Sequence, residues 1–204
     1  MTGPDPKRLA WAAVGRCIFT SIGMLARHQV RLPHGNLGRQ IQFANGSSAQ
    51  VYRETVIPRR TPKEPCFLAV SFRLRHLRGR GHRLFRMESI LNTPLFVGFP
   101  GFISKLWLAN DRDGLYRGLY EWDGADAAAS YARSLWRVLE LVSEPGSIDY
   151  RVVPGLRRDD AVGHPEGSGQ PPSPDRELAW WRVTERLTGA DRPRQITPPG
   201  PEST

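Results

Sequence analysis

Cysteine is nearly absent from the sequence, and the usual motifs for metals and nucleotides are missing. Only Cys17 and Cys66 occur among 204 residues, which excludes a disulfide scaffold and a zinc site of four thiolates. The five histidines show no HExxH or related spacing, so we expect no metal. Walker, GxGxxG and GxSxG motifs do not occur, so nucleotide-binding and serine-hydrolase functions have no support. Both cysteines have apolar neighbours, and we therefore expect reduced, buried thiols in a cytoplasmic protein.

Acidic residues and lysines are also few. Asp and Glu total 20 against 29 Lys and Arg, which gives a formal net charge of +9 and a pI near 10.3. The only lysines are Lys7, Lys63 and Lys105. Guanidinium groups suit phosphates and carboxylates, although a GC-rich coding sequence is the simpler explanation of this bias. The segment 73–86, with six arginines, two histidines and no acid, indicates a solvated loop or an electropositive rim.

The sequence has no long uninterrupted hydrophobic run. The apolar stretch 9–25 is interrupted by Arg16, is too short and too charged to span a bilayer, and is followed by no convincing signal-peptide cleavage site. We therefore predict a helix over 7–28 that packs on its own protein. The alternative is an amphipathic helix on a membrane surface, which it would contact through Arg8, Arg16 and Arg27.

The chain divides by its patterning into four segments. We expect an N-terminal helix in 1–34, a hairpin and linker in 35–65, a core in 66–155 and a largely disordered tail in 156–204. The hairpin is predicted over 40–56, around the turn signal Asn45-Gly46. Within the tail, a spacing of i, i+3, i+4 and i+7 predicts one short helix that contains Trp180, Val183, Thr184 and Leu187.

The patterning of the core segment, 66–155, predicts the order strand, helix, strand, strand, helix, strand. Alternation indicates strands over 67–74, 102–109, 115–122 and 148–153, and helical spacing indicates helices over 81–92 and 125–142. Right-handed crossovers fold this order into an α+β, ferredoxin-like domain, with a four-stranded antiparallel sheet and both helices on one face. We expect the other face to be covered by a second copy, which would make a homodimeric α/β barrel.

Strand periodicity also predicts a site on the face away from the helices. Side chains expected there come from three strands: Ser71, Arg73, Lys105, Trp107, Tyr116, Tyr120 and Trp122. An aromatic cavity with a few polar groups is typical of a small-molecule site, although the same aromatics would also fill a dimer core. Gly118, in the middle of a strand, indicates a close approach of a ligand or of backbone.

Several short motifs of the core resemble those of a known family. They are Glu88-Ser89-Ile90, Pro100-Gly101-Phe102, Lys105-Leu106-Trp107, Arg117-Gly118-Leu119-Tyr120 and an alanine-rich helix with Tyr131. In these motifs the chain resembles the YdhR-like mono-oxygenases of the antibiotic-biosynthesis mono-oxygenase superfamily, which are dimeric α/β barrels. The resemblance covers residues 66–155, and the chain departs from the family by the connection 92–99 and by long extensions at both ends.

The resemblance implies a cofactor-independent oxygenase that uses O₂ on a polycyclic, phenolic or similarly electron-rich small molecule. Trp122 matches the superfamily's functional tryptophan at the end of the third strand. In the haem-degrading branch an asparagine lies on the first strand, where this chain has Ser71 or Arg73. That branch also has a histidine on the second helix, and 125–142 contain none, so haem degradation is disfavoured. A need for haem or flavin is otherwise left open.

These observations lead to a hypothesis for the roles of the residues. Tyr120, Trp122 and Lys105 are the expected catalytic residues, with Tyr120 or Lys105 binding a phenolate or enolate and Trp122 stacking on the ring. The expected substrate-binding residues are Arg73, which would add positive potential, with Ser71, Trp107 and Tyr116.

Two other function classes remain open. One is a non-oxidative cyclase, isomerase or ligand-binding protein on the same barrel. The other is a nucleic-acid-binding module, because the RNA-recognition fold shares this order of elements. Its third-strand signature fails here, since Arg117-Gly118 is followed by Leu119 and then Tyr120, so we expect no nucleic-acid partner.

Overall fold

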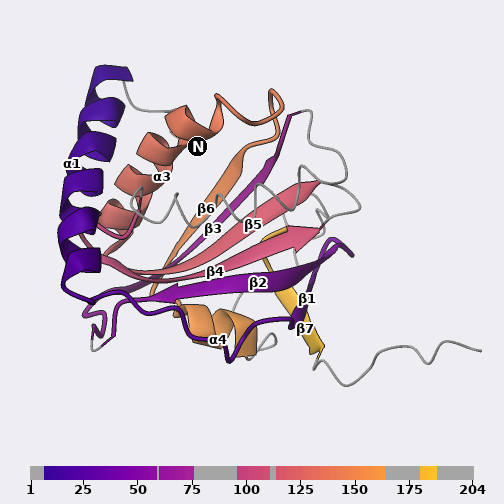
Figure 1. The fold of residues 1–204 in the computed structure, drawn as a ribbon. Helices are drawn as coiled ribbons and strands as arrows, with labels where there is room; N and C mark the ends of the chain where they lie inside the picture. Colours follow the sequence, from indigo (N-terminus) through magenta and orange to yellow (C-terminus); the bar gives the residue numbers. More distant parts are fainter. Residues whose placement is uncertain (1–6, 59, 76–95, 111–113, 164–179, 188–204) are drawn as a thin grey trace, which may run out of the picture.

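A computed structural model describes residues 7–58, 60–75, 96–110, 114–163 and 180–187. The chain is an α+β protein built on a curled, seven-stranded sheet with the order β6-β3-β5-β4-β2-β1-β7, in which every neighbouring pair is antiparallel (Figure 1). The elements are α1 Lys7–Ala26, β1 Gln40–Phe43, β2 Ser48–Val56, β3 Pro65–Arg73, β4 Phe102–Asn110, β5 Leu115–Asp123, α3 Ala125–Leu139, β6 Asp149–Pro154, α4 Arg158–Gly163 and β7 Val183–Leu187.

The four strands predicted for the core lie next to one another in the sheet. Their order, β6-β3-β5-β4, places the first predicted strand between the third and the fourth and the second at the edge of this group. α3 connects β5 to β6, as expected, and ends at Leu139 because residues 140–142 continue as a turn. The helix predicted over 81–92 lies outside the described residues.

The predicted hairpin is confirmed, and it extends the same sheet. Asn45 and Gly46 form the turn between β1 and β2, and Gly46 has a φ of +83°, a backbone conformation that glycine adopts without strain. β2 pairs with β4 along six positions, with a bulge between Val51 and Arg53. Residues of the hairpin therefore share a sheet surface with residues of the core.

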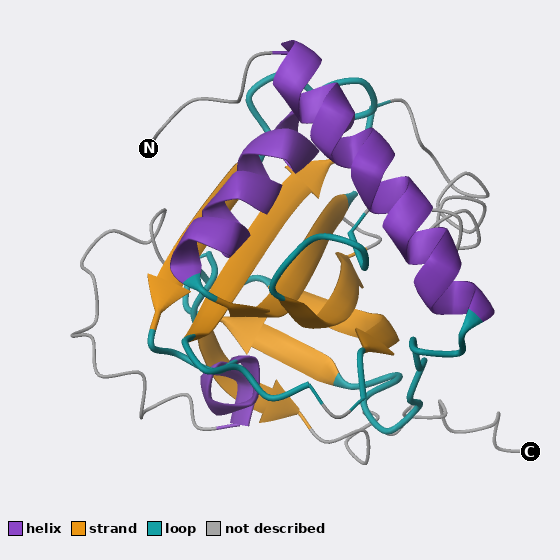
Figure 2. Ribbon diagram, turned by 90° about the vertical axis from the view of Figure 1, so that its left-hand side faces the viewer, coloured by secondary structure: helices purple, strands orange, loops and turns teal. Residues whose placement is uncertain are grey.

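Helices cover both faces of the sheet (Figure 2). On one face α1 and α3 bury a cluster that includes Cys66, Phe102 and Tyr131. On the other face, residues of β1, α4 and β7 bury a second cluster, in which the rings of Phe67 and Trp181 lie 6.2 Å apart. The face that was expected to need a second copy is thus covered in part by residues of the same chain, and the homodimer stays a prediction.

The short helix predicted around Trp180 is wrong, because Val183–Leu187 form β7. This strand pairs with β1, and Trp181 and Val183 are buried while Thr184 is exposed. Val183 and Leu187 are four residues apart, a spacing that fits both a helix and a strand, and pairing with the edge of β1 selects the strand. α4 also lies in the segment that was predicted to be largely disordered.

Within the described residues, no helix is both long enough and apolar enough to cross a membrane.

Candidate functional site

The seven predicted site residues do not share one face of the sheet. Tyr120 pairs with Leu68, and Trp122 pairs with Cys66, which places both aromatics on the face covered by α1 and α3. Lys105 and Trp107 lie on that face too, and so does Tyr116, which packs with Leu74 at its far end. The prediction that these five residues lie on the face away from the helices is therefore wrong.

Ser71 and Arg73 do lie on the opposite face, as predicted. They pair with Arg117 and Leu115, respectively. Ser71 is buried, whereas the side chain of Arg73 is exposed and its Nη1 lies 3.9 Å from Oε2 of Glu144. The structure therefore separates these two residues from the other five by the thickness of the sheet.

The amino group of Lys105 lies inside a cage of aromatic rings. Its Nζ is 3.1 Å from the centroid of the Trp107 ring, 4.6 Å from that of Phe96 and 4.7 Å from that of Tyr120. Only 6% of the residue is exposed, and among the described residues no carboxylate forms an ion pair with it. Burial, and secondarily the charge of Arg53, holds the pKa of Lys105 well below its usual range. We call Lys105, Trp107, Phe96 and Tyr120 the lysine cage.

Two residues of β2, Arg53 and Thr55, support the cage, and neither was predicted as a site residue. The guanidinium carbon of Arg53 lies 5.1 Å from the centroid of the Trp107 ring, and burial lowers the pKa of Arg53. Nε1 of Trp107 donates a hydrogen bond to Oγ1 of Thr55 at 3.1 Å. Arg53 and Thr55 lie two positions apart, so strand periodicity places them on the same face of β2. They were not considered for the site because the hairpin was predicted as a segment separate from the core.

Two tyrosines meet beside the cage. The hydroxyls of Tyr120 and Tyr131 are 3.2 Å apart, and burial raises the pKa of both phenols. These groups therefore stay protonated at neutral pH, where they act as hydrogen-bond donors and not as bases. Tyr131 was part of the family resemblance but was not predicted as a site residue.

Trp122 packs against the same pair of tyrosines. Its ring centroid lies 4.8 Å from that of Tyr131, and the residue is fully buried. Within the described part of the chain, its Nε1 has no hydrogen-bond partner. A buried donor without a partner costs free energy, which a hydrogen-bonding ligand would recover.

Gly118 is closely approached by the ring of Tyr120, and not by backbone as one form of the prediction expected. A Cβ atom at Gly118 would lie 2.5 Å from Cε2 of Tyr120 and 2.9 Å from its hydroxyl oxygen. Only glycine leaves room for the ring to fold back over the strand. Gly118 therefore positions the phenol against Tyr131.

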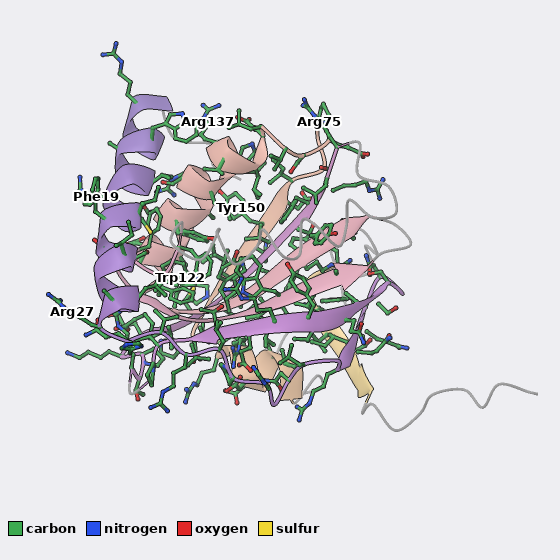
Figure 3. The ribbon with its side chains drawn as sticks, in the orientation of Figure 1. Phe19, Arg27, Arg75, Trp122, Arg137 and Tyr150 are labelled. Atoms are coloured by element: carbon green, nitrogen blue, oxygen red, sulfur yellow. The ribbon has the colours of Figure 1, made fainter. Side chains whose placement is uncertain are left out.

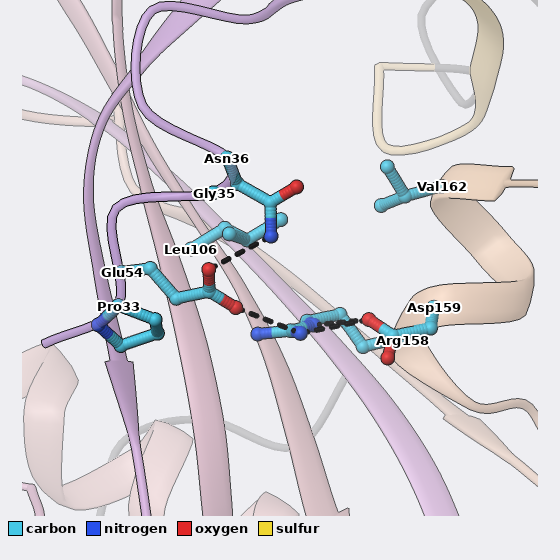
Figure 4. Close-up of a pocket in the computed structure, with 8 residues that line it drawn as sticks. All are labelled: Pro33, Gly35, Asn36, Glu54, Leu106, Arg158, Asp159 and Val162. Atoms are coloured by element: carbon cyan, nitrogen blue, oxygen red, sulfur yellow. Dashed lines mark hydrogen bonds and ion pairs between the residues drawn. The ribbon is translucent and has the colours of Figure 1, made fainter. Parts of the chain in front are cut away.

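A separate cavity of about 490 Å³ lies on the opposite face, between the loop after α1 and helix α4 (Figure 4). At its centre Nη2 of Arg158 contacts Oε1 of Glu54 at 3.0 Å, and both side chains are buried. Oε2 of Glu54 accepts a hydrogen bond from Nδ2 of Asn36 at 2.7 Å. The other lining residues are Pro33, Gly35, Leu106, Asp159 and Val162. The sequence did not indicate this cavity, because its walls are more than a hundred residues apart.

No protein-family model matches the chain, and a comparison with curated proteins also finds no match. The resemblance to the YdhR-like mono-oxygenases is untested by these comparisons and stays a prediction. Among the described residues, no group of three or more His, Cys, Asp or Glu could hold a metal ion. The arrangement of side chains around Lys105 therefore carries the functional argument.

Proposed function

We propose that the protein is a cofactor-independent mono-oxygenase that removes a proton from an aromatic or enolisable small molecule and lets the resulting anion react with O₂. The observation that carries this proposal is the amino group of Lys105, which is buried among aromatic rings and forms an ion pair with no carboxylate of the described residues. The proposal includes a ferredoxin-like core made by β3, β4, β5, β6, α3 and the helix expected over 81–92.

Lys105 has the properties of a general base. A lysine whose pKa is held well below its usual range gives up its proton more readily than a solvated lysine, and the free amine can accept a proton from carbon. The ammonium formed in this step lies next to the new substrate anion and stabilises it. Arg53 contributes a second positive charge, in the role that the sequence assigned to Arg73.

The surrounding donors suit the oxygen of an enolate or phenolate. The Tyr120 and Tyr131 hydroxyls are protonated, and Nε1 of Trp122 lacks a partner within the described chain. Preorganised donors in a site without water stabilise a developing oxyanion more strongly than water does. The rings of Trp107 and Phe96, which pack edge to face with centroids 5.2 Å apart, give the cage apolar walls.

The reaction balances without an added reductant when the reacting carbon is a CH₂ group between two arenes. Lys105 removes one proton, and the carbanion passes one electron to O₂. The substrate radical and superoxide then combine, and protonation gives a hydroperoxide. Loss of water from the hydroperoxide leaves a carbonyl, so that CH₂ and O₂ become C=O and H₂O.

Oxygen uptake with anthrone as the probe tests the proposal. We expect Lys105→Met to abolish uptake and Tyr120→Phe to reduce it at least tenfold, since each removes one interaction with the anion. Lys63→Met is the matched control, because Lys63 is an exposed lysine away from the cage, and it should react like wild type. Equal rates for the Lys105 and Lys63 variants would contradict the assignment.

A non-oxidative isomerase or cyclase is the second candidate, because the lysine cage supports proton transfer by itself. Deuterium exchange into anthrone without O₂ separates the two functions. A mono-oxygenase should show Lys105-dependent exchange in the absence of O₂ and uptake in its presence. Exchange that depends on Lys105 without any oxygen uptake would instead assign the non-oxidative function.

A further inference from the structure

The outward side of α1 carries large apolar side chains. Trp11 is 48% exposed, Phe19 81%, Ile22 54% and Leu25 39%. Figure 3 shows Phe19 on the side of α1 that points away from the rest of the molecule. A group of exposed aromatic and aliphatic side chains on one helix marks an interaction surface more often than a solvated one.

These residues are not needed to attach α1 to the protein. At 3.6 residues per turn, Trp11, Phe19 and Ile22 fall within an arc of roughly 80°. The residues that pack inward, Val14 and Cys17, lie on the other side of the helix and are buried. Ser21, also on that side, accepts a hydrogen bond at Oγ from the backbone N–H of Gly98 at 2.7 Å. The outward arc therefore remains available when α1 is docked.

The charged residues of α1 itself have one sign. The helix contains no acidic residue, and its basic residues are Lys7, Arg8 and Arg16. Arg8, Arg16 and Arg27 are exposed, and Figure 3 shows Arg27 at the C-terminal end of α1. Arginines beside exposed apolar residues are typical of helices that lie in the headgroup region of a bilayer, with their charged ends turned to the phosphates.

We propose that the outward face of α1 docks in the plane of an anionic lipid surface. Trp11, Phe19 and Ile22 would enter the boundary between headgroups and acyl chains, while Arg8 and Arg16 contact lipid phosphates. A second copy of the chain fits this face less well, since it would bring the same arginines together. The inference does not depend on the proposed enzymatic function.

Co-sedimentation of the full chain with vesicles tests this surface. The probe vesicles are phosphatidylcholine with one third phosphatidylglycerol, and the reference vesicles are pure phosphatidylcholine. We expect binding to the anionic vesicles that weakens as salt is raised, because screening reduces the attraction to phosphates. Phe19→Ser combined with Ile22→Ser should reduce the partition coefficient at least tenfold, since two buried side chains are lost.

A matched control uses exposed apolar residues outside α1. Leu141→Ser combined with Val142→Ser changes side chains that are 64% and 43% exposed and should leave binding unchanged. Arg8→Glu combined with Arg16→Glu should weaken binding to the anionic vesicles alone, so the inference does not rest on one variant. Thermal unfolding confirms that each variant is folded.

Three results would overturn the proposal. They are no binding of wild type to anionic vesicles, equal binding of wild type and the Phe19/Ile22 variant, and a self-association in solution that only the Phe19/Ile22 variant loses. The last result would assign the face to a second copy.

Discussion

At the scale of single residues, the burial of Lys105 costs free energy that an apolar side chain would not. Its amino group is enclosed by rings, and no carboxylate among the described residues compensates its charge. Methionine has a similar length and no charge, so we expect Lys105→Met to make the protein more stable while it abolishes turnover. Each kcal/mol gained should raise the melting temperature by about 2–4 °C in calorimetry. A lower melting temperature would mean that the amine makes a stabilising interaction.

The same residue predicts how this stability difference depends on pH. The pKa of Lys105 is lowered in the folded protein, whereas a lysine in the unfolded chain has a pKa of about 10.4. Between those two values the unfolded chain binds one more proton, so the stability of wild type rises with pH. The advantage of Lys105→Met should therefore be largest below the folded pKa and should shrink as pH rises toward about 10. Urea denaturation at several pH values measures this, and a constant advantage would contradict it.

At the scale of elements, the docking of α1 depends on a glycine outside the helix. A Cβ atom at Gly98 would lie 2.4 Å from the carbonyl oxygen of Cys17 and 2.8 Å from Oγ of Ser21. Gly98→Ala should therefore push α1 away and cost about 1–3 kcal/mol of unfolding free energy. Gly23→Ala is the control, because a Cβ there meets nothing within 4 Å and alanine favours a helix. Chemical denaturation measures the free energy of unfolding of both variants. Equal losses for Gly98→Ala and Gly23→Ala would contradict this explanation.

Helix α4 is held by the buried pair of Glu54 and Arg158. Arg158→Met leaves the Glu54 carboxylate buried without its main cation, so we expect a loss of about 3–5 kcal/mol. Replacing both residues by methionine removes the two charges together and should restore most of that loss. Urea denaturation of the single and double variants measures the coupling, and strictly additive losses would show that the pair does not act as a unit.

At the scale of the whole molecule, β7 closes one face of the sheet. Trp181, two residues before β7, is 6% exposed and packs against Phe67, a fully buried residue of β3. We expect Trp181→Ala to cost about 3–5 kcal/mol, since a large cavity would form between β7 and α4. Thermal and chemical denaturation measure the loss. A small loss would mean that β7 adds little to the stability of the sheet.

The positions of β1 to β6 along the chain could be predicted from the sequence, because alternation and turn residues are local signals, whereas β7 was predicted as a helix. The face of the sheet on which each side chain lies could not be predicted in the same way. Leu119 and Tyr120 are both buried, and so are Arg117 and Glu121, so neither side of β5 is a solvated face and its charged residues do not mark one. A bulge between Phe102 and Ser104 in β4 also reverses the alternation after Phe102.

The composition of the candidate site was predicted more completely than its position. Lys105, Trp107, Tyr120 and Trp122 do meet one another, because they lie at paired or alternate positions of two neighbouring strands. Arg53 was missed because its contact with Trp107 depends on the pairing of β2 with β4, which joins residues about fifty positions apart. Such pairings depend on the whole sheet and not on a local pattern.

The reactivity of the two buried thiols measures how often parts of the structure open. Burial raises the pKa of Cys17 and raises that of Cys66 to about 11, so both thiols should react slowly with alkylating reagents while the structure is closed. Cys17 lies on α1, whereas Cys66 lies on β3, between β5 and β6. Undocking of the helix would expose the Cys17 thiol directly, whereas Cys66 would keep its neighbours in β5 and β6 until the protein unfolds globally. The ratio of the two alkylation rates would then report how often α1 leaves the sheet without unfolding of the protein.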